Sequence, residues 1–131
     1  MRKEWKQKDK TLGEKAFDMQ MGKIMPHDLE AEQSLLGALL VYYNSIMNIS
    51  HLLKPTDFYS EANKVIFTHL LEIFQRGDQI STLNLMQSLR KSGEVELVGG
   101  LAKISRYSSG NIATDTFKTA LYIIELAKKR E

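Results

Sequence analysis

The most informative segment of this chain is PHDLEAEQSLLG, residues 26–37. Asp28 stands where a carboxylate can accept hydrogen bonds from the first free backbone N–H groups of a helix, and Glu30 and Glu32 suit the positive end of the helix dipole. Apolar residues then recur at three- and four-residue spacing, at Leu29, Leu36, Leu39, Leu40 and Tyr43. The pattern predicts a helix that begins after His27 and buries one face.

Gly37 lies inside this predicted helix. A glycine in a helix interior costs about 1 kcal/mol relative to alanine. Close approach of a second helix is a physical reason for a glycine here, so we expect a helix crossing at Gly37.

Capping and turn residues divide the rest of the chain into five further helices. They are a short helix capped by Asn44 or Ser45 and stopped at Lys54-Pro55, a helix from Ser60 to Gly77-Asp78, a helix from Ser81 or Thr82 to Ser92-Gly93, a short helix around Val98–Leu101, and a last helix from Thr114 or Asp115. No segment alternates with a period of two for long enough to predict a strand. The expected fold class is all-α, a compact bundle of about six helices.

Three details of this bundle are also predicted. The helix after Ser60 is apolar on more than one face, so we expect it to be the central, most buried helix. Phe58 and Tyr59, in the connector before it, are expected to fill the core. Residues 108–111 are expected to form a turn before the last helix.

The composition is that of one globular domain. The chain has 131 residues, of which 43% are hydrophobic and 26% charged, and a chain of this size buries roughly two thirds of its unfolded surface. It contains no cysteine, which excludes disulfides and cysteine metal sites and fits a reducing compartment. No apolar run approaches the ~18 residues of a membrane span. We expect a soluble, cytoplasmic protein.

Charge is distributed unevenly along the chain. Residues 1–25 hold seven basic and four acidic residues, a net charge of +3, whereas residues 26–131 hold eleven basic and twelve acidic residues, a net charge of −1. We expect a flexible basic extension over 1–25 and one domain over 26–131. A nearly neutral domain argues against a dedicated nucleic-acid surface. The extension fits a solvated tail or a weak DNA contact, and Lys128-Lys129-Arg130 fits a complement to the helix dipole or a phosphate patch.

No catalytic or metal-binding pattern is present. Gly22-Lys23 is the sole Gly-Lys pair and lacks the spacing of a phosphate-binding loop, so we expect no ATP binding by this chain. The histidines, at 27, 51 and 69, lack the spacing of a helical zinc site. The carboxylate pairs Glu30/Glu32 and Glu94/Glu96 are two residues apart, which on a helix points them to different faces; we expect them to be solvated. The sequence marks no serine or threonine beside a base.

The last helix is apolar on more than one face. Phe117, Ala120, Leu121, Ile124 and Ala127 form one stripe, and Tyr122, Ile123 and Leu126 point elsewhere. A terminal helix of this kind favours a contact outside its own domain, such as a second subunit, over simple central burial. The interface candidates are Phe117, Leu121, Ile124 and Lys128.

Several of these segments resemble the N-terminal domain of DnaB-type replicative DNA helicases. The resemblance covers residues 26–131 and rests on the 26–37 stretch, on Asp57-Phe58-Tyr59 followed by Ile66-Phe67, on Val98-Gly99-Gly100 and on Ile123-Ile124-Glu125. The positions that carry it are Pro26, Glu30, Glu32, Gln33, Gly37, Phe58, Phe67, Gly99 and Gly100. The chain departs from the family pattern at Asn63, where a histidine is usual, and at Gln79, Ser81, Asn84 and Lys103.

The resemblance implies a function that the residues alone do not indicate. Domains of this family form the collar of a hexameric ring, a trimer of dimers paired through a helical hairpin, and bind primase and the helicase loader. The last helix here would be the first arm of that hairpin. The parent protein would be an ATP- and Mg-dependent 5'-3' helicase on single-stranded DNA. The ATPase domain is absent from this chain, so a truncated protein or a stand-alone paralogue is expected.

Two other functions remain open on the residues alone. The chain fits a small helical DNA-binding regulator that uses its basic extension, which requires steeply salt-dependent affinity. It also fits a stand-alone adaptor. An enzyme in its own right has no supporting motif.

Overall fold

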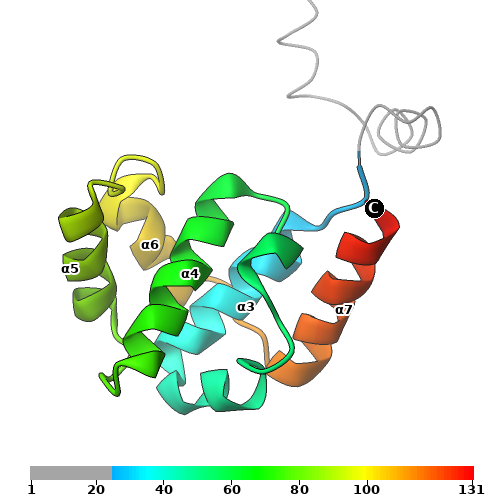
Figure 1. Ribbon diagram of the computed structural model, residues 1–131, viewed down its shortest axis with the longest axis horizontal. Helices are drawn as coiled ribbons and strands as arrows, with labels where there is room; N and C mark the ends of the chain where they lie inside the picture. The colour runs from blue at the N-terminus through cyan, green and yellow to red at the C-terminus, as the bar shows by residue number, and fades with distance from the viewer. Residues whose placement is uncertain (1–24) are drawn as a thin grey trace, which may run out of the picture.

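The computed structural model describes residues 25–131. The predicted basic extension therefore lies outside the described residues, except for Met25. The elements are α3 (Leu29–Val41), the 3-10 helices η1 (Tyr43–Asn48) and η2 (Pro55–Asp57), α4 (Glu61–Gln75), α5 (Thr82–Ser92), α6 (Gly100–Ser109) and α7 (Thr116–Lys129). Figure 1 shows α5 and α6 at one end of the molecule and α7 at the other, with α3 and α4 between them. Residues 25–131 contain no strand, so the all-α prediction is confirmed.

The predicted helix starts are mostly confirmed by their caps. Four side chains accept a hydrogen bond from the backbone N–H three residues later, which satisfies one of the free donors of a helix N-terminus. The pairs are Asp28 with Ala31, Ser60 with Asn63, Ser81 with Asn84, and Asp115 with Lys118, at 3.0–3.2 Å. Gly77 and Gly93 follow α4 and α5 with φ of +84° and +76°, a conformation that glycine adopts without strain.

The central helix is α3, and the prediction that α4 would be central is wrong. Of the 13 residues of α3, seven are buried, among them Leu35, Leu36 and Leu39, and the helix packs against α4, α6, α7 and η1. The apolar faces of α4 are covered only in part, since Phe74 is half-buried. Leu29 and Tyr43, expected in the buried stripe of this helix, are exposed, since Leu29 is the first residue of α3 and Tyr43 lies beyond its end, in η1.

The crossing expected at Gly37 is confirmed. A Cβ atom on this glycine would lie 2.0 Å from the carbonyl oxygen of Tyr107 in α6. Only a residue without a side chain lets the two backbones approach this closely. Gly37 therefore fixes where α6 crosses α3.

The short second helix differs from the prediction. It is a 3-10 helix, η1, and neither Asn44 nor Ser45 caps it. The Ser45 hydroxyl instead donates to the carbonyl of Tyr42 at 2.7 Å, a local side-chain bond of the kind that competes with α-helix. The segment still contributes to the core, because Ile46 and Ile49 are buried.

Two further expectations need correction. Ser108 and Ser109 belong to α6 and not to a turn, and their hydroxyls donate to the carbonyl of Ser105 within the helix. Of the two aromatic residues in the connector, Phe58 is buried, but Tyr59 is exposed.

None of the helices in residues 25–131 is long and apolar enough to cross a membrane.

Candidate functional site

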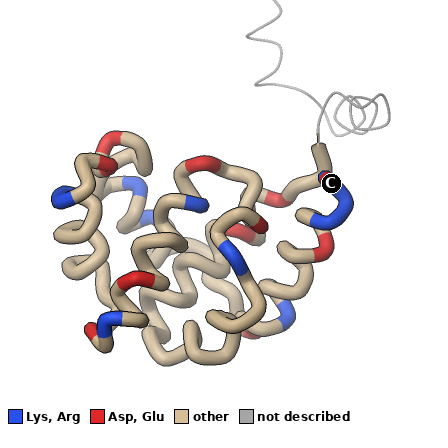
Figure 2. The backbone as a smooth tube through the Cα atoms, viewed as in Figure 1, with Lys and Arg blue, Asp and Glu red and all other residues tan. Residues whose placement is uncertain are grey.

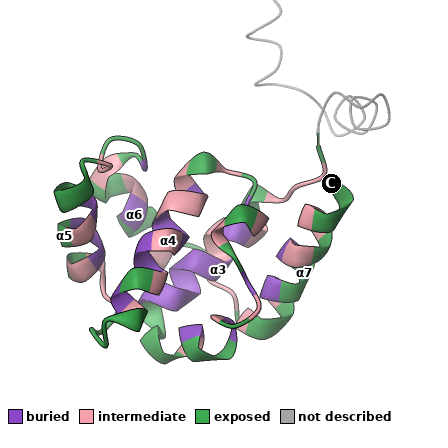
Figure 3. Cartoon of the chain, in the orientation of Figure 1, coloured by how far each residue is buried: buried purple, intermediate pink, exposed green. Residues whose placement is uncertain are grey.

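Helix α7 forms one end of the molecule and packs against α3, η1 and η2 (Figure 3). Its inward face consists of Ala120 and Ile123, which are buried, although Ile123 was expected to point away from the main stripe. Phe117 and Leu121 lie on the outside and remain 46% and 45% exposed. The helix therefore presents large apolar side chains that its own domain does not cover.

The other interface candidates on α7 lie nearer its C-terminal end. Ile124 is half-buried and packs against the core, and Lys128 is exposed. The Tyr122 side chain is exposed. Its hydroxyl donates a hydrogen bond to Asp28 Oδ2 at 3.2 Å. Desolvation, together with this hydrogen bond to the carboxylate, raises the pKa of the Tyr122 phenol. The outward apolar surface of α7 is thus centred on Phe117 and Leu121.

The C-terminal end of α7 is held by a clamp around Arg130. Its guanidinium donates to the backbone carbonyls of Pro26 and Asp57, both at 2.8 Å. The same group lies 5.5 Å from the centre of the Tyr59 ring, a favourable cation–π distance. The His27 ring stacks on Tyr59 with a centroid separation of 3.9 Å. Arg130 therefore has an internal structural role, which the sequence interpretation of a dipole complement or phosphate patch missed.

The Glu32 carboxylate is buried, and the prediction that it would be solvated is wrong. The residue is 2% exposed and accepts hydrogen bonds from the Tyr59 N–H at 2.7 Å and the Asn63 side-chain amide at 2.9 Å, with a longer contact to the Ser60 N–H. Asn63 in turn accepts from the Tyr107 hydroxyl at 2.6 Å. This network joins α3, α4 and α6 through polar groups inside the core.

Asn63 is one of the positions at which the chain departs from the family pattern, and the structure shows what it does. Its side-chain nitrogen donates a hydrogen bond to Glu32, and its side-chain oxygen accepts one from the Tyr107 hydroxyl. Burial, and secondly the charge of Glu32, raises the pKa of the Tyr107 hydroxyl. The hydroxyl therefore stays protonated and available as a donor.

The remaining resemblance positions have mainly structural places. Phe58 and Phe67 are buried with ring centroids 5.2 Å apart. Gly99 and Gly100 adopt φ of +90° and +77° at the start of α6. The carbonyl of Pro26 belongs to the Arg130 clamp. Glu30 and Gln33 line a hollow of about 430 Å³ between α3 and the end of α6.

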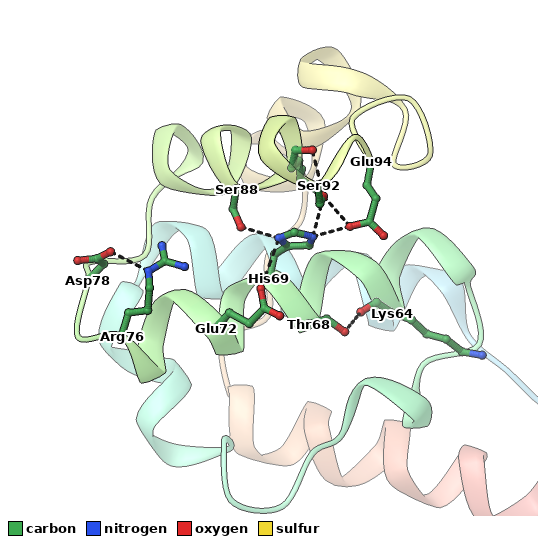
Figure 4. Close-up of polar contacts among 10 residues, drawn as sticks. Lys64, Thr68, His69, Glu72, Arg76, Asp78, Ser88, Ser92 and Glu94 are labelled. Carbon is green, nitrogen blue, oxygen red and sulfur yellow. Dashed lines mark hydrogen bonds and ion pairs between the residues drawn. The ribbon is translucent and has the colours of Figure 1, made fainter.

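His69 makes a second polar cluster, between α4 and α5 (Figure 4). The buried ring contacts the Ser88 hydroxyl through Nδ1 at 2.6 Å and Glu94 through Nε2 at 2.7 Å. Ser92 also donates to Glu94 at 2.7 Å. The hydrogen bonds from His69 and Ser92 lower the pKa of the Glu94 carboxyl. Glu94 is therefore not the purely solvated group that its spacing predicted.

The contacts Ser88–His69–Glu94 follow the order of a nucleophile, a base and an orienting carboxylate. Sequence reasoning missed this group because its members lie 19 and 25 residues from His69. Ser88 lies in the middle of α5, where backbone N–H groups are used within the helix, so none is free to stabilise an oxyanion. The cluster therefore acts as a polar link between α4, α5 and the segment after α5. No three potential metal-ligating side chains gather within residues 25–131.

Comparison with known proteins identifies relatives of most of the described region. The family model of the DnaB-like helicase N terminal domain matches residues 24–126. The chain is 38% identical over 90 residues to the replicative DNA helicase DnaB of Pasteurella multocida, which covers 69% of this chain and 19% of that protein. It is 30% identical over 117 residues to the replicative DNA helicase DnaB of Buchnera aphidicola subsp. Baizongia pistaciae, covering 88% of this chain and 25% of the relative.

A solved structure agrees with these relatives. The crystal structure of the N-terminal domain of DnaB helicase from Mycobacterium tuberculosis superposes with a TM-score of 0.77 and 28% identity, covering 82% of this chain and 77% of that one. The chain spans between a fifth and a quarter of the length of the two curated relatives.

Proposed function

Because the chain belongs to the family of DnaB-like helicase N-terminal domains, we propose that it is a self-associating scaffold in DNA replication. The observation that carries the proposal is the outward face of α7. Phe117 and Leu121 are large and apolar, lie one helical turn apart and are about half exposed. Exposed aromatic and aliphatic side chains on one helix face favour packing against a second helix.

The contact that we propose is with a second copy of the chain, with α7 as the first arm of a pairing hairpin. Phe117, Leu121 and Ile124 supply the apolar contact, and Lys128 lies at its polar edge. Pairs of such domains would build the collar of a hexameric ring. In that assembly the domain binds primase and the helicase loader in the cytoplasm.

Helicase activity itself belongs, in this proposal, to a protein of the relatives' length. Such a protein would use ATP and Mg²⁺ to move 5'-3' on single-stranded DNA. The 131 residues of this chain contain no phosphate-binding loop, so we expect them to hydrolyse no ATP alone. A steady-state ATPase assay with single-stranded DNA tests this expectation, and turnover would contradict it.

A DNA-binding regulator has less support. Of the basic end residues, Arg130 is occupied by two backbone carbonyls, and residues 26–131 carry a net charge of −1. Titration of labelled DNA at two salt concentrations separates the two functions. A regulator would bind with an affinity that falls steeply with salt, whereas the scaffold would bind weakly or not at all.

Sedimentation velocity of α7 variants tests the scaffold. Phe117→Glu and Leu121→Glu place a charge on the proposed contact and are expected to weaken self-association at least tenfold. Leu83→Glu is the matched control, because Leu83 lies on α5 and is 64% exposed. If both α7 variants associate like the control, α7 is not the contact.

A further inference from the structure

A second exposed apolar surface lies at the end of α3 and on η1. Four large side chains project to solvent within seven residues, and we call them the η1 surface: Val41, Tyr42, Tyr43 and Met47. Tyr42 and Met47 are 58% and 60% exposed, more than either Phe117 or Leu121. The core of the domain does not need these four side chains, because Ile46 already fills the buried side of the same segment.

The η1 surface lies in a part of the chain without charge. Residues 33–53 contain no Asp, Glu, Lys or Arg, and Figure 2 shows η1, at the bottom of the molecule, entirely in the tan of the uncharged residues. Ordinary protein surface is kept soluble by interspersed charges. Depletion of charge together with exposed Tyr and Met is the composition of the core of a protein interface.

A hollow of about 280 Å³ adjoins this surface. It lies between η1 and the α4–α5 connector, and its lining includes Tyr43, Met47, Phe74 and Ile80. Interfaces gain most of their affinity where an apolar or aromatic side chain enters such a pocket. The η1 surface thus has both protruding side chains and a recess.

The outward face of α7 is too small for a stable contact by itself. Phe117, Leu121 and Tyr122 are each about half exposed, so they offer on the order of 300 Å² of surface, given that an aromatic side chain buries roughly 150–250 Å². A standard interface takes about 800 Å² from each partner. More surface must take part if α7 is to pair.

The η1 surface is a candidate for the additional area, because η1 is in direct contact with α7. Of the 13 large hydrophobic residues exposed in the described part of the chain, seven lie on α7 or on the η1 surface. Together they offer on the order of 600 Å², and an interface includes polar atoms in addition to its apolar ones.

We propose that the η1 surface is the second half of the self-association surface and is covered by another copy of this chain. This inference rests on the proposed function, since it assumes that α7 pairs. The inference adds to the contact a segment that lies far from α7 in the sequence. Both α7 and the η1 surface then contribute to the free energy of self-association.

Self-association of surface variants of the full chain tests the proposal. Tyr42→Ser and Met47→Glu are expected to raise the dissociation constant at least tenfold in sedimentation experiments, as Phe117→Glu does, and Leu83→Glu to leave it unchanged. All four residues are exposed, and circular dichroism melting checks that each variant folds. If Phe117→Glu weakens association while Tyr42→Ser and Met47→Glu do not, the proposed function stands and the η1 surface is not part of the contact.

A photocrosslink gives an independent measurement. Tyr42→p-benzoylphenylalanine is expected to yield a covalent dimer of the chain on irradiation, and the same substitution at Leu83 is expected to yield none. Absence of the Tyr42 crosslink, or an unmodified chain that is monomeric at every concentration, overturns the proposal. Binding of a different protein at Tyr42 in place of a second copy overturns it as well.

Discussion

The carboxylate of Glu32 and the side-chain amide of Asn63 form a buried hydrogen bond of 2.9 Å between α3 and α4. Glu32 also accepts a hydrogen bond from the backbone N–H of Tyr59, in the connector before α4. Asn63 in turn accepts a hydrogen bond from the Tyr107 hydroxyl in α6. A buried carboxylate is tolerated only when its oxygen atoms are hydrogen-bonded. The pair therefore fixes the mutual positions of the three helices that carry the rest of the domain.

Removal of the Glu32 carboxylate should destabilise the domain strongly. Glu32→Ala leaves buried donors of Tyr59 and Asn63 without an acceptor, and the expected loss is about 3 kcal/mol in the free energy of unfolding. Glu32→Gln keeps one acceptor oxygen and should lose less. Urea unfolding followed by circular dichroism measures both. Glu30→Gln, at an exposed position of the same helix, is the control and should stay within about 0.5 kcal/mol.

A methyl group at Gly37 should disrupt the crossing of α3 and α6. The new Cβ would lie 2.0 Å from the Tyr107 carbonyl oxygen, so one backbone must move, and overpacking of this kind costs about 3 kcal/mol or more. Gly110→Ala is the control, since its Cβ meets its nearest neighbour at 3.1 Å. Thermal melts of Gly37→Ala and Gly110→Ala compare the two. Equal melting temperatures would show that α6 does not need the close approach.

Loss of the Arg130 guanidinium should release the last turn of α7. Arg130→Gln removes two hydrogen bonds and the contact with Tyr59. Hydrogen exchange of the last α7 amides and of the His27 amide should accelerate together, because one side chain holds both segments. Lys129→Gln changes the neighbouring charge, whose ion pair with Glu125 is exposed at 3.8 Å, and should leave exchange unchanged. Acceleration confined to α7 would argue against a clamp.

The hydrogen bonds of Glu94 should contribute to stability only above the pH at which its carboxyl ionises. Its pKa in the folded protein lies below the ordinary value of 4.5. A carboxyl with a depressed folded pKa stabilises above its unfolded pKa, and this contribution is lost as the pH falls through the folded pKa. Glu94→Gln should therefore be less stable than the unmodified chain at pH 7, and the difference should shrink below pH ~4.5. Urea unfolding at several pH values measures it. A difference that is constant with pH would rule out an ionised Glu94 as the cause.

Local features of the fold were predictable from the sequence, and long-range ones were not. Caps such as Asp28 and Ser60 act on residues three positions away, so their signal lies within a few letters of sequence. The burial of Glu32 depends on Asn63, 31 residues later, and a carboxylate in a first helical turn is normally explained by the dipole alone.

The face of α7 shows the same limit. Periodicity places Ala120 in one apolar stripe with Phe117 and Leu121, but in the structure Ala120 is buried with Ile123, while Phe117 and Leu121 are exposed. Periodicity alone therefore does not identify the inward face of a helix that is apolar on more than one side. Helix α7 packs against α3, and its buried Ala120 is small, as suits a close approach of two helices. The larger side chains Phe117 and Leu121 are then left outside, which makes them available for a partner.

Sedimentation equilibrium of the full chain over a wide concentration range is the decisive measurement of self-association. We expect a mass that rises with concentration from the 15.0 kDa of one chain toward that of a dimer or a larger ring. A mass of 15.0 kDa at every concentration would contradict it.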